Sequence, residues 1–356
     1  MAFLLIPISL RIGLCWGASA EKSWGPMNEI EAAARKEGKL VIYSGTGHTT
    51  PESQAGVSQV FKEKYGITIE WTSLSAREIS PRVMAEQRTK QYTVDIAMSG
   101  IEGNYTELKP RGYVVPVLAP STLEKGVWRL DPATAFPKDR DWLFINMPLR
   151  PSFFINTRLV PPGEEPNGYQ DLLNPKWRGK IVIQFPWSGG TGSGWFRSVY
   201  RALGLDYMRA LAKQVALLAG TNDVPDAVVR GQYPISIAAS PARGRQLVQE
   251  GGPVRFIQPK EGSHMAVQGV EFIANAPHMN AAKLFFHWFY TREGQSISAP
   301  KTNAISVRKD VPQDYLPPDE RYVDGQPFMM PAPEDFTVEK NAELSKLAEE
   351  IFKQQR

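Results

Sequence analysis

Residues 38–71 read GKLVIYSGTGHTTPESQAGVSQVFKEKYGITIEW, and this stretch decides the fold class. Its apolar run at 40–43 is typical of a buried strand. From residue 51 to residue 65, apolar side chains recur at helical spacing, and a glycine follows at the position that ends many helices. A second apolar run at 67–71 predicts another strand. A strand, a helix and a strand in this order predict an α/β fold with a mostly parallel sheet.

Small polar loops follow the predicted strands. A third strand is predicted at 94–98, after a helix that begins near Ser75, where Glu78 three residues later fits a capping box. In such sheets ligands bind outside the carboxyl ends of the strands. The loops at these ends are therefore expected to line one crevice, and their candidate ligand-binding residues are Ser44, Gly45, Thr46, Arg77 and Ser99.

Composition and charge are those of an ordinary soluble chain. The 356 residues suffice for two lobes, and 41 basic residues nearly balance 37 acidic ones, giving a net charge of +4. No run of Lys or Arg occurs, so we expect no nucleic acid as a partner. Beyond the first twenty residues, no stretch approaches the length of about 20 apolar residues that a membrane span needs.

Residues 1–20 read MAFLLIPISLRIGLCWGASA and resemble an export signal. The segment is apolar, lacks acidic residues and ends in the small-x-small pattern of a signal-peptidase site; a buried N-terminal strand or helix is the alternative. The only cysteine, Cys15, lies inside it. After cleavage the chain would have no thiol for disulfides, catalysis or metal binding, and we expect a periplasmic protein.

A glycine-rich stretch at 185–204, FPWSGGTGSGWFRSVYRALG, connects a predicted strand to a predicted helix. Free backbone N–H groups at such a helix start, with nearby hydroxyls, suit an anion; a flexible turn with a capping serine is the alternative. The stretch lacks the Gly-Lys-Ser/Thr of a triphosphate loop, the glycine spacing of a dinucleotide turn and a G-x-S-x-G nucleophile elbow. The candidates here are Ser188, Gly190, Thr191, Gly192 and Ser193.

Four segments, in this order, resemble one known family. They lie at 33–45, 154–160, 171–181 and 276–295. On these segments the chain resembles the type II periplasmic solute-binding proteins of ATP-driven (ABC) importers, in the branch that includes ferric-ion and anion binders. The resemblance runs through nearly all of the chain after residue 20.

The resemblance implies two α/β lobes joined by two crossing strands, near 144–154 and 260–270, that close on a ligand. The implied division of the chain is a signal peptide at 1–20, the first part of lobe I at 24–149, lobe II at 150–265, and the second part of lobe I with a C-terminal helix at 266–356. It also implies no cofactor, a monomer, and an ABC permease in the inner membrane as partner. Presentation of the ligand to a sensor kinase is an alternative role.

Iron binding and hydrolysis are the competing functions. The ferric binders carry two adjacent tyrosines after the strand that begins here at Pro234, where this chain has Ala239, Ser240 and Pro241. Ferric iron prefers hard anionic oxygen ligands, which a serine and a proline do not supply. The four histidines stand beside no serine in a hydrolase motif, and the chain is expected to be no enzyme. They are His48, His264, His278 and His287.

Arginines would supply the charge for an anionic ligand. Arg77, at a helix start, is a candidate for two-point binding of a carboxylate or phosphonate. The resemblance implies Arg150, at the first crossing, as a second candidate, and Arg243, after a strand end, is a third; a solvated or ion-paired surface arginine is the alternative for each. Ser240 joins the candidate site from its place after a strand. Four aromatic residues near these loops are expected to pack in the core rather than against a ligand: Tyr43, Phe154, Trp187 and Trp195.

Overall fold

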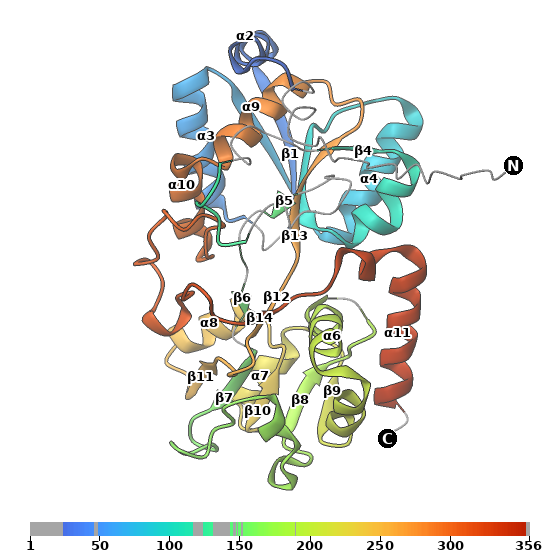
Figure 1. Cartoon of the computed structure of the whole chain (residues 1–356), viewed down its shortest axis with the longest axis vertical. Helices are drawn as coiled ribbons and strands as arrows, with labels where there is room; N and C mark the ends of the chain where they lie inside the picture. The colour runs from blue at the N-terminus through green and yellow to red at the C-terminus, as the bar shows by residue number, and fades with distance from the viewer. Residues whose placement is uncertain are drawn as a thin grey trace, which may run out of the picture.

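The computed structural model describes residues 24–45, 49–116, 124–130, 143–144, 147, 149–150, 152–188 and 190–353. Two α/β lobes, each built on its own sheet, lie one above the other and meet at thin connecting strands (Figure 1). This arrangement confirms the predicted two-lobed α/β class.

The first lobe contains a sheet in the order β2-β1-β3-β13-β4, with β5 paired to β13. Strands β1, β2 and β3 are parallel, and β13 runs antiparallel to β3. The bounds are β1 Lys39–Gly45, β2 Thr68–Leu74, β3 Ile96–Gly100, β4 Val114–Val115, β5 Leu143–Phe144 and β13 Gln268–Ile273. The parallel β1–β2 pair confirms the unit predicted from residues 38–71.

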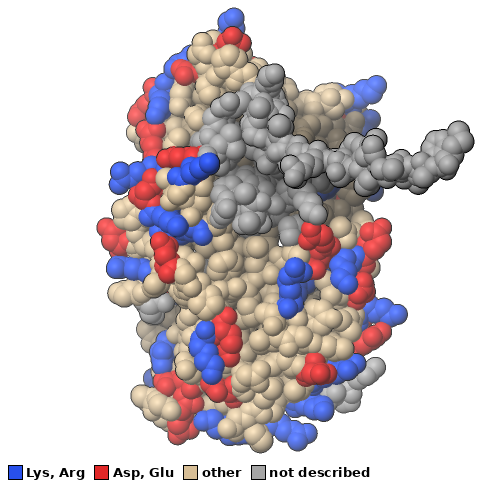
Figure 2. Space-filling model, viewed as in Figure 1, with Lys and Arg blue, Asp and Glu red and all other residues tan. Residues whose placement is uncertain are grey.

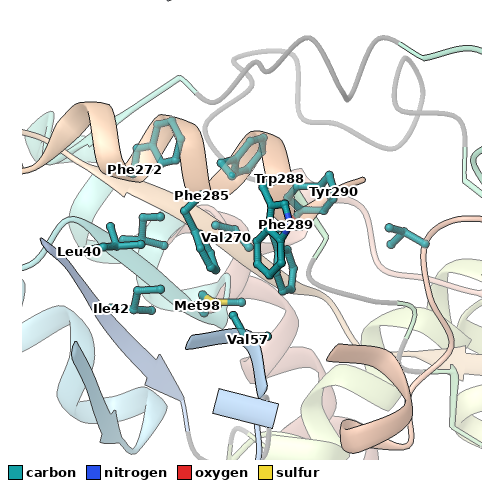
Figure 3. Packing of buried hydrophobic residues seen from close by; sticks show 14 of the residues in the cluster. Leu40, Ile42, Val57, Met98, Val270, Phe272, Phe285, Trp288, Phe289 and Tyr290 are labelled. Carbon is teal, nitrogen blue, oxygen red and sulfur yellow. The ribbon is translucent and has the colours of Figure 1, made fainter. Parts of the chain in front are cut away.

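Helices cover both faces of this sheet. On one face lie α2 (Met27–Glu37), α3 (Pro51–Tyr65), α9 (Met279–Phe289) and α10 (Arg292–Thr302). Figure 3 shows Phe285 of α9 on the side of Leu40 and Ile42 of β1, whereas Trp288 of α9 lies farther along the helix, and its ring contacts Phe61 of α3. Helix α4 (Ala76–Thr89) covers the other face. The core is therefore continuous from the sheet into the helices on both sides.

Helix ends follow the local sequence signals. Gly38 and Gly66 end α2 and α3 with φ of 67° and 74°, a conformation that glycine adopts without a Cβ penalty. Thr50 caps α3 by accepting the Ser53 N–H at 3.1 Å. At the start of α4, the Ser75 N–H donates to Glu78 at 2.7 Å. The predicted helix end at the glycine after residue 65 and the capping box are confirmed.

The second lobe contains a sheet in the order β11-β7-β10-β8-β9. Strands β8, β9 and β10 are parallel, and β7 is antiparallel to both β10 and β11. The elements are β7 Phe153–Asn156, β8 Ile181–Gln184, α6 Gly190–Ala212, β9 Val215–Leu218, α7 Asp223–Val229, β10 Ile235–Ile237, α8 Pro241–Gln249 and β11 Val254–Ile257. Helix α6 is two helical stretches that meet at Gly204 (φ 80°).

Short helical turns complete the described chain. They are η1 Asn104–Leu108 and η2 Lys109–Arg111 after β3, η4 Tyr169–Leu173 and η5 Pro175–Trp177 before β8, and η6 Pro318–Glu320 and η7 Pro333–Phe336 near the C-terminal end. None of the described helices is long and apolar enough to cross a membrane.

Three strands, rather than the expected two, pass between the lobes. Strands β6 (Leu149–Arg150) and β12 (Ser263–Met265) fall in the two predicted crossings. A third strand, β14 (Phe328–Met329), pairs parallel with β12. Met329 enters the core of the second lobe, whereas the flanking Phe328 and Met330 pack against the core of the first. We define these three strands as the hinge sheet.

The C-terminal helix corrects the expected grouping of residues 266–356 with the first lobe. After the hinge sheet, α11 (Val338–Lys353) runs alongside α6 of the second lobe (Figure 1). Its buried residues Leu344, Ala348 and Ile351 belong to the second-lobe core. The amphipathic pattern predicted a buried face, but it carries no information about which lobe receives that face.

Candidate functional site

The chain direction brings the polar strand ends of both lobes to the junction between them. Strand β12 leads from the hinge sheet into β13, so β13 runs away from the junction, and the antiparallel β3 runs toward it together with β1 and β2. In the second lobe β7 runs away from the junction, and β10 runs back toward it with β8 and β9. Ligands of α/β sheets bind at such carboxyl ends.

A hydroxyl network occupies the first-lobe side of the junction. The Ser44 and Thr49 hydroxyl oxygens lie 2.7 Å apart. The Gln54 side-chain amide, on the first turn of α3, donates to Thr49 Oγ1 at 2.9 Å and to Ser73 Oγ at 3.2 Å. Ser44 and Ser73 are partners in the β1–β2 register, which places both hydroxyls at the same level of the sheet. We call Ser44, Thr49, Gln54 and Ser73 the hydroxyl network.

Counting hydrogens shows which groups of this network remain free. A hydroxyl has one hydrogen and two acceptor positions. Both Gln54 N–H groups are used on Thr49 and Ser73, and one hydrogen joins Ser44 to Thr49. One hydroxyl hydrogen of the Ser44–Thr49 pair and the hydroxyl hydrogen of Ser73 therefore have no acceptor within the network. The network keeps these two donors for a ligand, together with unused acceptor positions on its hydroxyls.

The other ligand-binding candidates of the first lobe do not belong to the hydroxyl network. Gly45 is the last residue of β1, and Thr46 lies outside the described residues. Ser99, near the end of β3, is buried and donates its hydroxyl to the Gly100 carbonyl at 3.2 Å. Arg77 is the second residue of α4, at the junction end of that helix, and its side chain lies outside the described residues.

The glycine-rich stretch forms the second-lobe side of the junction, and much of it is helical. Helix α6 starts at Gly190, so Thr191, Gly192 and Ser193 belong to its first turn. The Gly192 N–H donates to Gln184 Oε1 at 3.0 Å and is not available to a ligand. Ser188 precedes the helix, is exposed and donates its hydroxyl to the Phe185 carbonyl at 3.1 Å.

Gly192 is required by packing rather than by a ligand. A Cβ at this position would lie 2.8 Å from the carbonyl oxygens of both Gln184 and Phe185. The Gln184 amide also donates to Thr221 Oγ1 at 2.7 Å, which ties the loop after β8 to the loop after β9. Gln184, the polar residue at the end of the apolar strand β8, thus holds two loops of the candidate site together. The sequence analysis did not identify it.

The end of β10 carries an unusual backbone conformation. Ala238 has φ of 56°, which is uncommon for a residue with a Cβ, and its N–H donates to the Ser152 carbonyl at 3.1 Å. Ser240 caps α8 by accepting the Arg243 N–H at 3.5 Å. The strand therefore ends at the junction in a constrained turn that fixes the start of α8.

Of the three candidate arginines, one is engaged elsewhere. Arg243 donates to Asp226 at 2.8 Å and lies 3.9 Å from Glu250, so its charge is balanced within the second lobe. Arg150 lies on β6, with His264 as its register partner, and its side chain is outside the described residues. Arg77 and Arg150 thus remain candidates by position alone.

Two histidines take part in described polar pairs. His264 Nδ1 lies 2.9 Å from Ser198 Oγ, and the same hydroxyl lies 2.9 Å from the Gly194 carbonyl, to which it can donate. Both side chains are buried in the interior of the protein. His278 Nδ1 lies 3.0 Å from Asp95, and burial raises the pKa of that carboxyl, against the effect of hydrogen bonds from Val41 and His278.

The aromatic candidates pack as the sequence analysis expected. Tyr43, Phe154 and Trp195 are fully buried. Burial, with a hydrogen bond to Glu86, raises the pKa of Tyr43 to about 12. Trp187 stacks on Phe185 with ring centroids 4.9 Å apart.

The described part of the chain has no group of three or more His, Cys, Asp or Glu side chains arranged to hold a metal ion. His48 lies outside that part. On the face shown in Figure 2, basic and acidic side chains are interspersed. The hydroxyl network itself consists of uncharged hydroxyl and amide groups.

Comparison with known proteins agrees with this two-lobed architecture. Residues 40–299 match the model of a family described as bacterial extracellular solute-binding protein. The chain belongs to this family. A curated relative, an uncharacterized protein of Haemophilus influenzae, is 22% identical over 297 residues, covering 81% of this chain and 83% of the relative.

Solved structures share the fold at low identity. Ferric iron-binding protein A of Mannheimia haemolytica, in an open conformation, has a TM-score of 0.69 and 18% identity, covering 89% of this chain and 99% of that one. Iron-bound HitA of Pseudomonas aeruginosa has a TM-score of 0.65 and 17% identity, covering 88% and 99%. AfuA of Actinobacillus pleuropneumoniae, with fructose-6-phosphate bound, has a TM-score of 0.62 and 18% identity, covering 88% and 98%. The solute-binding family implies an extracellular, periplasmic location and a small-molecule ligand.

Proposed function

We propose that this solute-binding protein captures a small anionic ligand, such as an organic acid, phosphonate, sulfonate or sugar phosphate, and releases it unchanged to an ABC permease. Residues 1–20 would direct export to the periplasm, and the protein would act as a monomer. The observation that carries the proposal is that two hydroxyl hydrogens of the hydroxyl network remain free to donate to a ligand. A ligand between this network and the start of α6 would meet donors from both lobes.

Lobe closure would strengthen these hydrogen bonds. Closure excludes water, and a hydrogen bond to a charged acceptor is stronger in the drier site. Neutral donors would hold the ligand without a covalent step. The permease, or in the alternative role a sensor kinase, would recognise the closed state.

Ferric iron is the second candidate ligand, because two structures of similar fold are titled as iron-binding proteins. Against it stands the end of β10, where Ala239, Ser240 and Pro241 offer no anionic oxygen. A thermal-shift screen separates the two ligands. Methylphosphonate, methanesulfonate, citrate, fructose 6-phosphate and ferric chloride would each be titrated against the protein. A rise in melting temperature with an anion supports the proposal, and a rise with ferric ion alone overturns it.

Substitutions in the hydroxyl network test the site itself. Thr49→Val and Ser44→Ala should each weaken the anion identified by the screen by roughly 10-fold or more, because a hydrogen bond to a charged group is worth about 1.5–3 kcal/mol. Thr89→Val is the matched control: it removes a hydroxyl that donates to Ala85 at the far end of α4. Unchanged affinity in both network variants would remove the network from the binding site.

A further inference from the structure

Arg197 is a buried cation without a carboxylate partner in the described part of the chain. Its residue surface is 3% exposed, and its Nε–H has no acceptor there. One terminal nitrogen donates to Asn341 of α11, and the guanidinium carbon lies 5.4 Å from the centre of the Phe336 ring. Buried charges are normally paired, because burial without a partner costs several kcal/mol.

The position of Arg197 on α6 directs its charge toward the lobe junction. It stands seven residues after Gly190, or about 10 Å along the helix axis. Helical side chains lean toward the N-terminus, so the guanidinium lies nearer to the junction than its own Cα. Across the junction, Glu102 follows the end of β3 by two residues.

Glu102 is an anion without a cationic partner within ion-pair distance in the described residues. Its backbone carbonyl accepts the Thr106 hydroxyl at 2.8 Å, but no described Lys or Arg lies within 4 Å of its carboxylate. Burial lowers the pKa of Arg197, and the negative charges of Glu102 and Asp335 oppose that effect. Of these two acids, Glu102 has the larger effect on the pKa of Arg197. Arg197 on α6 and Glu102 after β3 thus carry opposite charges on the two lobes and form no contact ion pair.

We propose that Arg197 and Glu102 form an ion pair between the lobes when the lobes close further, and that this pair favours the closed state. The first lobe supplies the Glu102 carboxylate and the second lobe supplies the Arg197 guanidinium. The distance between these two groups therefore depends on the hinge sheet. Asp335, in η7, is the other nearby acid, but its carboxylate accepts the Ala332 N–H within its own turn. The inference deepens the proposed capture by lobe closure, and it can be tested without a ligand.

The test measures the distance between lobes in solution. Spin labels would be placed at Gln59→Cys on α3 and Arg209→Cys on α6, both exposed, with Cys15, the only native cysteine, replaced by serine. Pulsed dipolar spectroscopy then gives the populations of closed and open lobes. We expect Glu102→Gln and Arg197→Gln each to lower the closed-to-open ratio by about fivefold, the effect of a modest ion pair.

The double variant and a control decide the interpretation. If the pair acts as one unit, combining Glu102→Gln with Arg197→Gln lowers the ratio no further than either change alone. Arg201→Gln, on the next turn of α6 and exposed, should leave the distances unchanged. If Arg197 only anchors α11, Arg197→Gln lowers the melting temperature, and Glu102→Gln leaves the closed-to-open ratio unchanged. That outcome would overturn the inference. Failure of the ligand screen would leave this result intact.

Discussion

Two glycines on the first turns of α6 make a matched pair whose substitution should have opposite effects. At Gly192, an added Cβ would lie 2.8 Å from two backbone carbonyl oxygens, a distance that real Cβ atoms do not adopt. At Gly194, the nearest atoms to an added Cβ belong to the His264 ring at 3.6 Å, which is ordinary contact. Both positions are helical, so intrinsic helix propensity favours alanine at each.

The expected energies follow from these contacts. Gly192→Ala must move the backbone at the end of β8 and break the hydrogen bond to Gln184, and overpacking of this kind costs about 1–3 kcal/mol. Gly194→Ala gains helix propensity of up to about 1 kcal/mol with no clash to offset it. In a chain of this size, 1 kcal/mol corresponds to a shift in melting temperature of about 2 °C.

Urea unfolding and differential scanning calorimetry of both variants would measure the difference. We expect Gly192→Ala to lower, and Gly194→Ala to keep or raise, the free energy of unfolding. Because Gly192 sets the position of the α6 start, its alanine variant should also weaken anion binding, whereas the Gly194 variant should not. Equal stability of the two variants would refute the view that Gly192 is a packing requirement.

Three further changes test other parts of the structure. Burial lowers the pKa of His287 below 6.5. The stability that neutral His287 contributes is therefore complete above pH 6.5 and is lost as the pH falls through the lower, folded-state pKa. In His287→Gln, the melting temperature should fall less as the solution is made acidic. Ile351→Ala should cost about 2–4 kcal/mol and speed hydrogen exchange in α11 if that helix is docked on the second lobe; unchanged exchange would contradict the docking. Arg243→Gln should leave anion affinity within twofold, measured by calorimetry, because Asp226 already holds this arginine, and a large loss would place Arg243 in the site.

Local signals predicted the parts of the fold that depend on neighbours in sequence. Gly38 and Gly66 end helices because their conformation is set within one turn. The start of α4 is likewise fixed by Ser75 and Glu78. The crossing strand β14 left no such signal, because two residues in a proline-rich segment show no periodicity. Its pairing with β12 depends on a partner some sixty residues away in the chain.

The start of α6 depends on a contact that is distant in the sequence. Glycine has low helix propensity, which disfavours a helix through Gly190, Gly192 and Gly194. The structure offsets this cost through the Gln184 side chain, which accepts the Gly192 N–H and joins two loops. Of the predicted donors in this stretch, one backbone N–H is consequently used by the protein itself.

Residue types alone do not define the ligand chemistry of the hydroxyl network. A hydroxyl donates or accepts, and serine, threonine and glutamine at these positions are compatible with either kind of ligand. The register of β1 and β2 places Ser44 level with Ser73, and the first turn of α3 brings Gln54 between Thr49 and Ser73. Because Gln54 uses both of its N–H groups inside the network, the donors that remain for a ligand are hydroxyl hydrogens. Which groups remain thus follows from how the hydrogen bonds are shared, which the sequence does not specify and the fold does.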